Sequence, residues 1–282
     1  MTSAAADAEH YCETLVRDAD RDRFLATLFA PQPQRRHLLA LHAFDIEIAR
    51  IRYAVHEPMA GEIRLQWWRE AIGGERDGEA AANPVAAALI DAIAVHALPR
   101  QPFIDLIEAR SFDLYTDPMV SVAALDGYAD KTDGGILTLA ARIAAGAPPD
   151  PAIRRAAFAQ TTVRIVQSLA RDAARGQLYL PLDVMQQFGA APEDLFAGKV
   201  TPELEAVLAN LRLRARDALA AARSALGAMT PAMLPAVLPL APVKPLLKAM
   251  ERAHPAFTPP DVSRWRRQWA IWRASRDPAR MV

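Results

Sequence analysis

The sequence has 282 residues, enough for one large domain or two small ones. Hydrophobic residues make up 52% of it, which is typical of a chain with a sizeable core and excludes a disordered protein. The 33 basic residues balance 33 acidic ones, which argues against a nucleic-acid binder, and the single Cys12 excludes a disulfide framework or a cysteine zinc site.

The N-terminal residues show no basic start followed by an apolar run, so we expect no secretory signal. No stretch approaches about 18 uncharged apolar residues, so we expect no membrane-spanning helix. These features predict a cytoplasmic protein whose contact with the inner membrane, if it has one, is peripheral.

Near the N-terminus, Asp18, Asp20 and Asp22 alternate like the start of a calcium loop. Arg23 and Phe29 stand where such a loop needs glycine and glutamate. We therefore expect these carboxylates to cap a helix or to pair with neighbouring arginines.

Helical periodicity dominates the chain, and alternating strand patterns are nearly absent. Over residues 35–56 one apolar stripe holds Leu41, Phe44, Ile48, Ile51 and Val55, and a second holds Leu39, Ile46, Ala49 and Tyr53. A helix that is apolar on two sides is usually buried between neighbours. Further helices are predicted over roughly residues 59–75, 84–97, 101–116, 119–146, 151–176, 202–227, 231–252 and 261–275.

Turn and capping residues separate these segments. Gly73, Gly74 and Gly78 mark a loop, while Asp150 and Thr201 each precede a proline that suits the first position of a helix. No linker forces a division of the chain. We therefore predict an all-α fold and one domain over residues 1–282.

The last predicted helix carries Trp265, Trp269 and Trp272 on one stripe, at i, i+4 and i+7. Arginines surround the stripe at positions 264, 266, 267, 273 and 276. This pattern fits a helix that lies on anionic lipid. It equally fits a final helix that caps its own core, with arginine stems along the rings.

Three segments resemble the squalene/phytoene synthase family. Residues 35–53 (RRHLLALHAFDIEIARIRY) are similar to its first Asp-rich segment, residues 128–135 (YADKTDGG) to its YxxxAGxxG element, and residues 171–181 (RDAARGQLYLP) to its second Asp-rich motif with RGRxYLP. The order and spacing agree across roughly residues 12–190. The resemblance implies an isoprenoid-synthase-like helical bundle.

The resemblance also implies a chemistry. Family members ionise a prenyl diphosphate, and Mg²⁺ held by two carboxylate clusters neutralises the departing pyrophosphate. The first cluster falls on Ala49, Arg50 and Tyr53 in this sequence, and the second on Ser168 and Asp172. Asp172 is the one motif carboxylate retained, which makes it the candidate catalytic residue. We expect no metal ligands and no cofactor, and Mg²⁺ only if the chain is active.

Basic and polar side chains take the place of the carboxylates. The candidate ligand-binding residues are Arg50, Tyr53, Tyr128, Arg164, Ser168, Arg171 and Arg175. Arginine binds phosphate without a metal, so they could hold an anionic head group. The alternative is that the arginines between 164 and 175 form the solvated face of a surface helix.

Residues 57–70 (EPMAGEIRLQWWRE) resemble the branch of the family that includes the mitochondrial respiratory complex I assembly factor and its bacterial relatives. The resemblance implies a non-catalytic accessory protein that binds a prenyl diphosphate or anionic lipid, a membrane surface or a respiratory-complex protein, and no nucleic acid. Core packing is the simpler explanation for Trp67 and Trp68, since aromatic side chains chiefly bury apolar area. The alternative function is an active transferase that condenses prenyl diphosphates head to head at an altered metal site.

Overall fold

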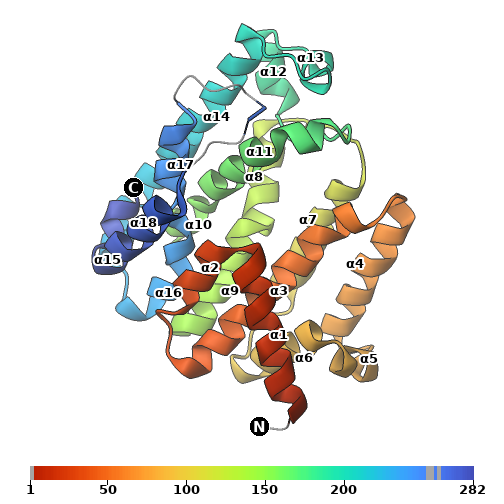
Figure 1. Ribbon diagram of the computed structural model, residues 1–282, viewed down its shortest axis with the longest axis vertical. Coiled ribbons are helices and arrows are strands. Elements are labelled where there is room, and N and C mark those ends of the chain that lie inside the picture. Colours follow the sequence, from red (N-terminus) through yellow and green to blue (C-terminus); the bar gives the residue numbers. More distant parts are fainter. Residues whose placement is uncertain (1–2, 252–256, 259–261) are drawn as a thin grey trace. The chain divides into compact units, whose positions relative to one another are not determined.

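The computed structural model describes residues 3–251, 257–258 and 262–282 (Figure 1). Every regular element in these ranges is a helix, which confirms the predicted all-α fold. The internal contacts divide the chain into two compact units, each built from three separate stretches. Unit 1 comprises Met1–Leu114, Gly135–Pro149 and Met229–Pro239, and unit 2 comprises Tyr115–Gly134, Asp150–Ala228 and Leu240–Val282. The single domain over residues 1–282 stays a prediction.

Unit 1 is built around the helix predicted over residues 35–56. Its helices are α1 (Ser3–Ala19), α2 (Arg21–Thr27), α3 (Gln32–Ala54), α4 (Pro58–Gly73), α5 (Asp77–Ala82), α6 (Pro84–Val95), α7 (Gln101–Ser111), η1 (Phe112–Leu114), η2 (Pro231–Met233), α16 (Leu234–Val237) and all but the first two residues of α9 (Asp133–Ala145). The helices α1, α3 and α6 pack against one another. Phe44 on α3 meets the rings of Trp68 and Phe103 edge to face, at centroid distances of 5.2 and 5.6 Å. Both apolar stripes of α3 thus contribute side chains to the core, and Ile46 is buried as predicted.

Unit 2 is organised by two long helices. It contains α8 (Val122–Lys131), α10 (Pro151–Arg155), α11 (Ala157–Ala173), α12 (Leu182–Phe188), α13 (Pro192–Phe196), α14 (Pro202–Ala221), α15 (Arg223–Ala228), α17 (Val243–Ala249), α18 (Arg264–Arg276) and η4 (Pro278–Met281). The helix α14 packs on α11 and α12, and its buried residues recur with helical period: Leu204, Val207, Leu208, Leu211 and Ala215. The helix α11 also contacts α8 and α17.

The predicted helix starts at Asp150 and Thr201 are confirmed. The Asp150 side chain accepts a hydrogen bond from the Ala152 amide at 2.7 Å, and Thr201 caps α14 at the Leu204 amide. Asp20 likewise caps α2 at the Arg23 amide and pairs with the Arg23 side chain. The capping interpretation of the N-terminal aspartates therefore holds at Asp20.

Four predicted helices are each shorter or more broken than the periodicity suggested. The helix expected over residues 119–146 is two helices, because Thr132 leaves helical geometry (φ −88°, ψ −92°) and its hydroxyl bonds the Tyr128 carbonyl. Residues 151–176 break at Ala156 and residues 202–227 at Ala222. Over residues 231–252, prolines at 231, 235, 239, 242 and 245 leave only short helical turns.

One stretch of the described residues has the length and apolar character to cross a membrane. It is Pro231–Ala249, with a mean hydropathy of 1.2, and 61% of it is buried inside the protein. A buried apolar stretch of this kind is ordinary for the core of a folded domain.

Candidate functional site

The predicted site residues are divided between the two units. Arg50 and Tyr53 lie near the end of α3 in unit 1. In unit 2, Tyr128 lies on α8; Arg164, Ser168, Arg171 and Asp172 lie on α11, and Arg175 follows that helix. Each set is described within its own unit.

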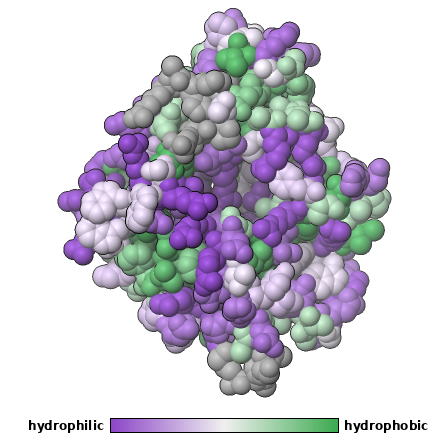
Figure 2. Space-filling view, viewed as in Figure 1, coloured by the Kyte–Doolittle hydropathy of each residue, from purple (hydrophilic) through white to green (hydrophobic). Residues whose placement is uncertain are grey.

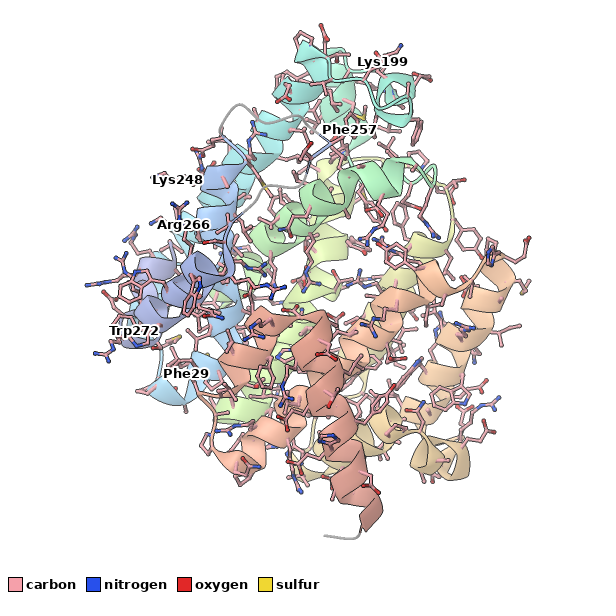
Figure 3. All side chains as sticks on the ribbon, viewed as in Figure 1. Phe29, Lys199, Lys248, Phe257, Arg266 and Trp272 are labelled. Atoms are coloured by element: carbon pink, nitrogen blue, oxygen red, sulfur yellow. The ribbon has the colours of Figure 1, made fainter. Side chains whose placement is uncertain are left out.

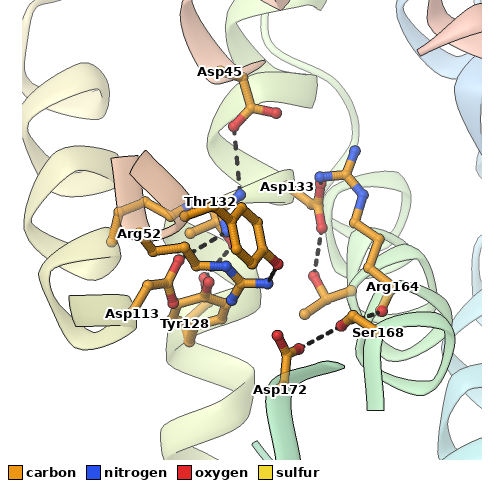
Figure 4. Close-up of polar contacts among 12 residues, drawn as sticks. Asp45, Arg52, Asp113, Tyr128, Thr132, Asp133, Arg164, Ser168 and Asp172 are labelled. Atoms are coloured by element: carbon orange, nitrogen blue, oxygen red, sulfur yellow. Dashed lines mark hydrogen bonds and ion pairs between the residues drawn. The ribbon is translucent and has the colours of Figure 1, made fainter. Parts of the chain in front are cut away.

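Asp172 and Ser168 contact each other one helical turn apart on α11. The Ser168 hydroxyl donates to Asp172 Oδ2 at 2.5 Å, and it also lies 2.9 Å from the Arg164 carbonyl oxygen (Figure 4). The Asp172 side chain is buried. The two positions that correspond to the second carboxylate cluster thus form a hydrogen-bonded pair that holds one carboxyl group.

Arg164 is held by a carboxylate that the sequence analysis did not single out. Asp133, which is buried at the start of α9, pairs with Arg164 Nη1 at 3.1 Å and accepts a hydrogen bond from the Thr161 hydroxyl at 2.7 Å (Figure 4). This contact joins residues of the YADKTDGG segment to α11. Because Asp133 offsets the charge of Arg164, that arginine adds less net positive charge than its sequence position suggested.

Arg171 and Arg175 are exposed. They stand at the end of α11, where Gly176 has a left-handed conformation (φ +73°) and the Gln177 amide bonds the Asp172 carbonyl at 2.9 Å. The glycine of RGQLYLP therefore ends the helix. An anion bound by these two arginines would stay in contact with water, where each ion pair contributes only about 0.2–1 kcal/mol.

Tyr128 is a packing residue in unit 2. Its buried ring lies 6.0 Å, centroid to centroid, from Tyr179 of the LYLP segment. That segment is fixed by backbone bonds of 2.9 Å from the Met119 amide to the Leu178 carbonyl and from the Leu182 amide to the Met119 carbonyl. The structure thus brings together two of the segments that the resemblance singled out.

Asp45, the buried carboxylate of α3, is neutralised within unit 1. Arg23 Nη1 lies 2.5 Å from Asp45 Oδ2, and Arg110 Nη2 lies 3.5 Å from Asp45 Oδ1. Arg110 also pairs with Asp113 at 3.3 Å, and all four side chains are buried. Asp45 therefore serves a structural ion network, and it is not a substitute for the missing first cluster.

Arg50 is exposed and lines a small pocket of about 220 Å³ in unit 1. Arg64 and Trp67 of α4 line the same pocket, together with Glu47. Tyr53 is half-buried, and the Arg52 guanidinium lies over its ring and donates to its hydroxyl. Arg50 thus shares its surroundings with a second arginine that sequence analysis did not select.

The residues of the 57–70 segment have identifiable packing roles. A Cβ on Gly61 would lie 2.5 Å from Leu114 Cδ2, so the glycine permits close approach of that side chain. Trp68 is buried in the core, which favours the packing interpretation for that residue. Trp67 donates its indole N–H to Glu79 at 3.0 Å.

A polar cluster on α3 was also missed from the sequence. The buried His37 lies 2.7 Å from His96 and 3.0 Å from Asp91, beside a cavity of about 710 Å³ that α1 and α6 help to line. Burial lowers the pKa of His37 although Asp91 opposes the shift, and burial also lowers the pKa of His96. The spacing of 59 residues between the two histidines gives no sequence signal.

The residue types at the family's magnesium positions do not fit that ion. Mg²⁺ takes an octahedral shell of oxygen ligands in which carboxylates provide the protein's share. Alanine, arginine and tyrosine occupy the first cluster, and the second holds one carboxylate already bonded to Ser168. Across the described ranges, no three His, Cys, Asp or Glu side chains gather in a way that could hold a metal ion.

Comparisons with known proteins find one matching family and two kinds of relative. The sequence model of the family described as squalene/phytoene synthase matches residues 16–273. "NADH dehydrogenase (ubiquinone) complex I, assembly factor 6" of Rattus norvegicus is 27% identical, over 89% of this chain and 78% of the relative. "15-cis-phytoene synthase" of Synechococcus elongatus is 25% identical, over 76% and 74%.

Solved structures share the fold. A dehydrosqualene synthase crystallised with a ligand superposes with a TM-score of 0.82 at 18% identity, covering 96% of each chain. The predicted isoprenoid-synthase-like fold is therefore confirmed. The relatives also confirm the predicted resemblance of the chain to the branch that contains the complex I assembly factor.

Proposed function

The chain belongs to the squalene/phytoene synthase family, and we propose that it is a non-catalytic member with an accessory or assembly-type role. The observation that carries the proposal is the residue set at the magnesium positions. Ala49, Arg50, Tyr53 and Ser168 replace carboxylates, and Asp172 is bonded to Ser168. Without a metal shell, departing pyrophosphate would lack the charge neutralisation on which ionisation depends.

The proposed ligand is a prenyl- or lipid-like molecule with an anionic head group. Arg171 and Arg175, supported by Arg164, would contact the head group directly, because guanidinium groups bind phosphate without a metal. Since the first two are exposed, the binding is weak and sensitive to salt. The assembly-factor relatives support a respiratory-complex protein as the protein partner of this chain.

Farnesyl diphosphate titrated into the protein in magnesium-free buffer with EDTA should give a calorimetric binding signal that weakens as NaCl is added. Replacing Arg171 and Arg175 together by glutamate should lower the affinity by about tenfold, since two solvated ion pairs become repulsive. The fold should be unaffected because both side chains are exposed.

The matched control reverses two exposed charges elsewhere in unit 2, with Lys199→Glu and Arg280→Glu. It changes the net charge equally and should leave the affinity within about twofold, because neither side chain belongs to the proposed head-group site and exposed charges are screened by salt. The proposed ligand role is wrong if both double variants bind alike. It is also wrong if the parent binds only after magnesium is added.

A further inference from the structure

The tryptophans of α18 face away from the body of unit 2. Trp265, Trp269 and Trp272 are 81%, 57% and 42% exposed, whereas Ile271 and Ala274 are the buried residues of the helix. The interpretation in which the tryptophans face their own core is therefore wrong. Trp269 and Trp272 stack on each other with a centroid distance of 4.7 Å, so these two indoles form one aromatic surface.

Three of the chain's five tryptophans lie on this one helix. An indole leaves a large apolar area in water unless another surface covers it, and its N–H suits a boundary between apolar and wet surroundings. Figure 2 shows this region at the left, with pale aromatic side chains standing among hydrophilic ones over α18.

The surroundings of the tryptophans are strongly basic. The helix carries five arginines and no acidic residue, although the chain as a whole has no net charge. Arg276 lies over the Trp272 ring at 4.4 Å. Trp272 and Arg266 of α18 project outward, as does Lys248 of α17 (Figure 3).

Further cations lie on α17, the helix that contacts α18. The pKa of Lys244 on α17 is lowered, first by burial and then by the like charges of Arg223, Arg273 and Lys248. These cations come from α15, α17 and α18, which all belong to unit 2. Arg223 and Lys244 both donate to the main-chain oxygen of Val282 at 2.8 Å, so it is Lys248 of α17 that extends the basic surface beyond the helix that carries the tryptophans.

We propose that α18 is a docking surface for an anionic lipid bilayer, with its indoles at the level of the head groups and its arginines on lipid phosphates. Interfacial helices combine these features: an aromatic stripe, flanking arginines and low overall hydrophobicity. The exposed large apolar side chains of the helix are tryptophans alone, and indoles suit the boundary between apolar and wet surroundings. Five arginines on each copy would oppose self-association through this face.

This surface lies on α18 and does not depend on the proposed ligand role of α11. The test is co-sedimentation of the full chain with vesicles of phosphatidylcholine, either alone or mixed with phosphatidylglycerol. The parent should bind the anionic vesicles at least about tenfold more tightly than the neutral ones, and added NaCl should release it. Tryptophan fluorescence should shift to the blue on binding, as the indoles leave water.

Two variants separate the aromatic and charged contributions. Trp265→Ala with Trp269→Ala should reduce binding by about tenfold or more, and Arg264→Gln with Arg266→Gln should abolish the preference for anionic vesicles. The control Phe196→Ala with Val200→Ala removes similarly exposed apolar groups in the same unit and should bind like the parent. Circular dichroism and melting should match the parent for all three variants.

Three outcomes overturn the proposal. The parent could leave both kinds of vesicle unbound, or the tryptophan variant could bind them as tightly as the parent. The third outcome is lipid-independent self-association of the parent, measured by sedimentation velocity, that the tryptophan variant loses, which would assign the surface to a second copy of this chain.

Discussion

Replacing Asp45 by alanine should lower the free energy of unfolding by about 3–5 kcal/mol, because it removes the buried partner of two buried guanidinium groups. Asp45 contacts Arg23 at 2.5 Å and Arg110 at 3.5 Å inside unit 1. In the variant, Arg110 still pairs with Asp113. Arg23 still pairs with the partly exposed Asp20, but at a longer distance than its pair with Asp45. Guanidinium groups cannot lose their proton at any accessible pH, so the charge must be hydrated or the unit must open.

The free energy of unfolding is measured by urea denaturation. Its dependence on urea concentration is compared between the parent and the variant. The control is Asp130→Ala, which removes an exposed carboxylate with two bonds to Arg154 at 2.6 and 2.8 Å. It should cost about 0.2–1 kcal/mol. Equal losses for the two variants would contradict the account of Asp45 as the centre of a buried network.

A further variant distinguishes charge from packing. Asp45→Leu combined with Arg23→Met removes both partners of the 2.5 Å ion pair. It should be more stable than Asp45→Ala, because apolar replacement of a buried ion pair is often close to neutral. A double variant that is less stable than Asp45→Ala would mean that steric packing of the larger side chains, and not the loss of the ion pair, determines stability at this site.

Replacing Ile46 by aspartate should also destabilise the protein by about 3–5 kcal/mol. Ile46 is 9% exposed on α3, the helix that packs against α1 and α6. A carboxylate there has to be protonated, or be hydrated by opening the packing, and either process costs several kcal/mol. Protonation removes the buried charge. The difference in free energy of unfolding between the variant and the parent, measured by urea titration, should therefore become smaller as the pH falls towards 4.

The matched control is Ala54→Asp, which adds the same charge at an exposed position on the same helix. It stands at the helix C-terminus, where a negative charge costs only about 0.3–1 kcal/mol. An Ile46→Asp protein as stable as this control would show that the second apolar flank of α3 is not part of the core.

The parts of the fold that follow local rules could be predicted from the sequence. The helix α3 follows from two apolar stripes, and the caps at Asp150 and Thr201 follow from side chains that reach amides two or three residues ahead. The breaks could not be predicted in this way. The late start of α8 reflects pairing of Met119 with Leu178 and Leu182, about 60 residues away.

The same limit applies to the candidate site. The replacement of carboxylates at Ala49, Arg50, Tyr53 and Ser168 is visible in the sequence, because the neighbouring motif residues fix the register. That Arg164 is held by Asp133 is not visible, since the partner lies on another helix. Likewise, helical period placed the three tryptophans on one face of α18, but it could not tell whether that face points inward.

Release of pyrophosphate tests most directly the proposal that this family member does not ionise prenyl diphosphates. The full chain is incubated with farnesyl or geranylgeranyl diphosphate and Mg²⁺, and inorganic pyrophosphate is followed with a coupled enzymatic assay. The account predicts release no faster than in the protein-free control, because the residues at the metal positions cannot assemble a magnesium shell. Protein-dependent release that requires Mg²⁺ and is lost in Asp172→Ala would contradict the claim and establish an active transferase with an altered metal site.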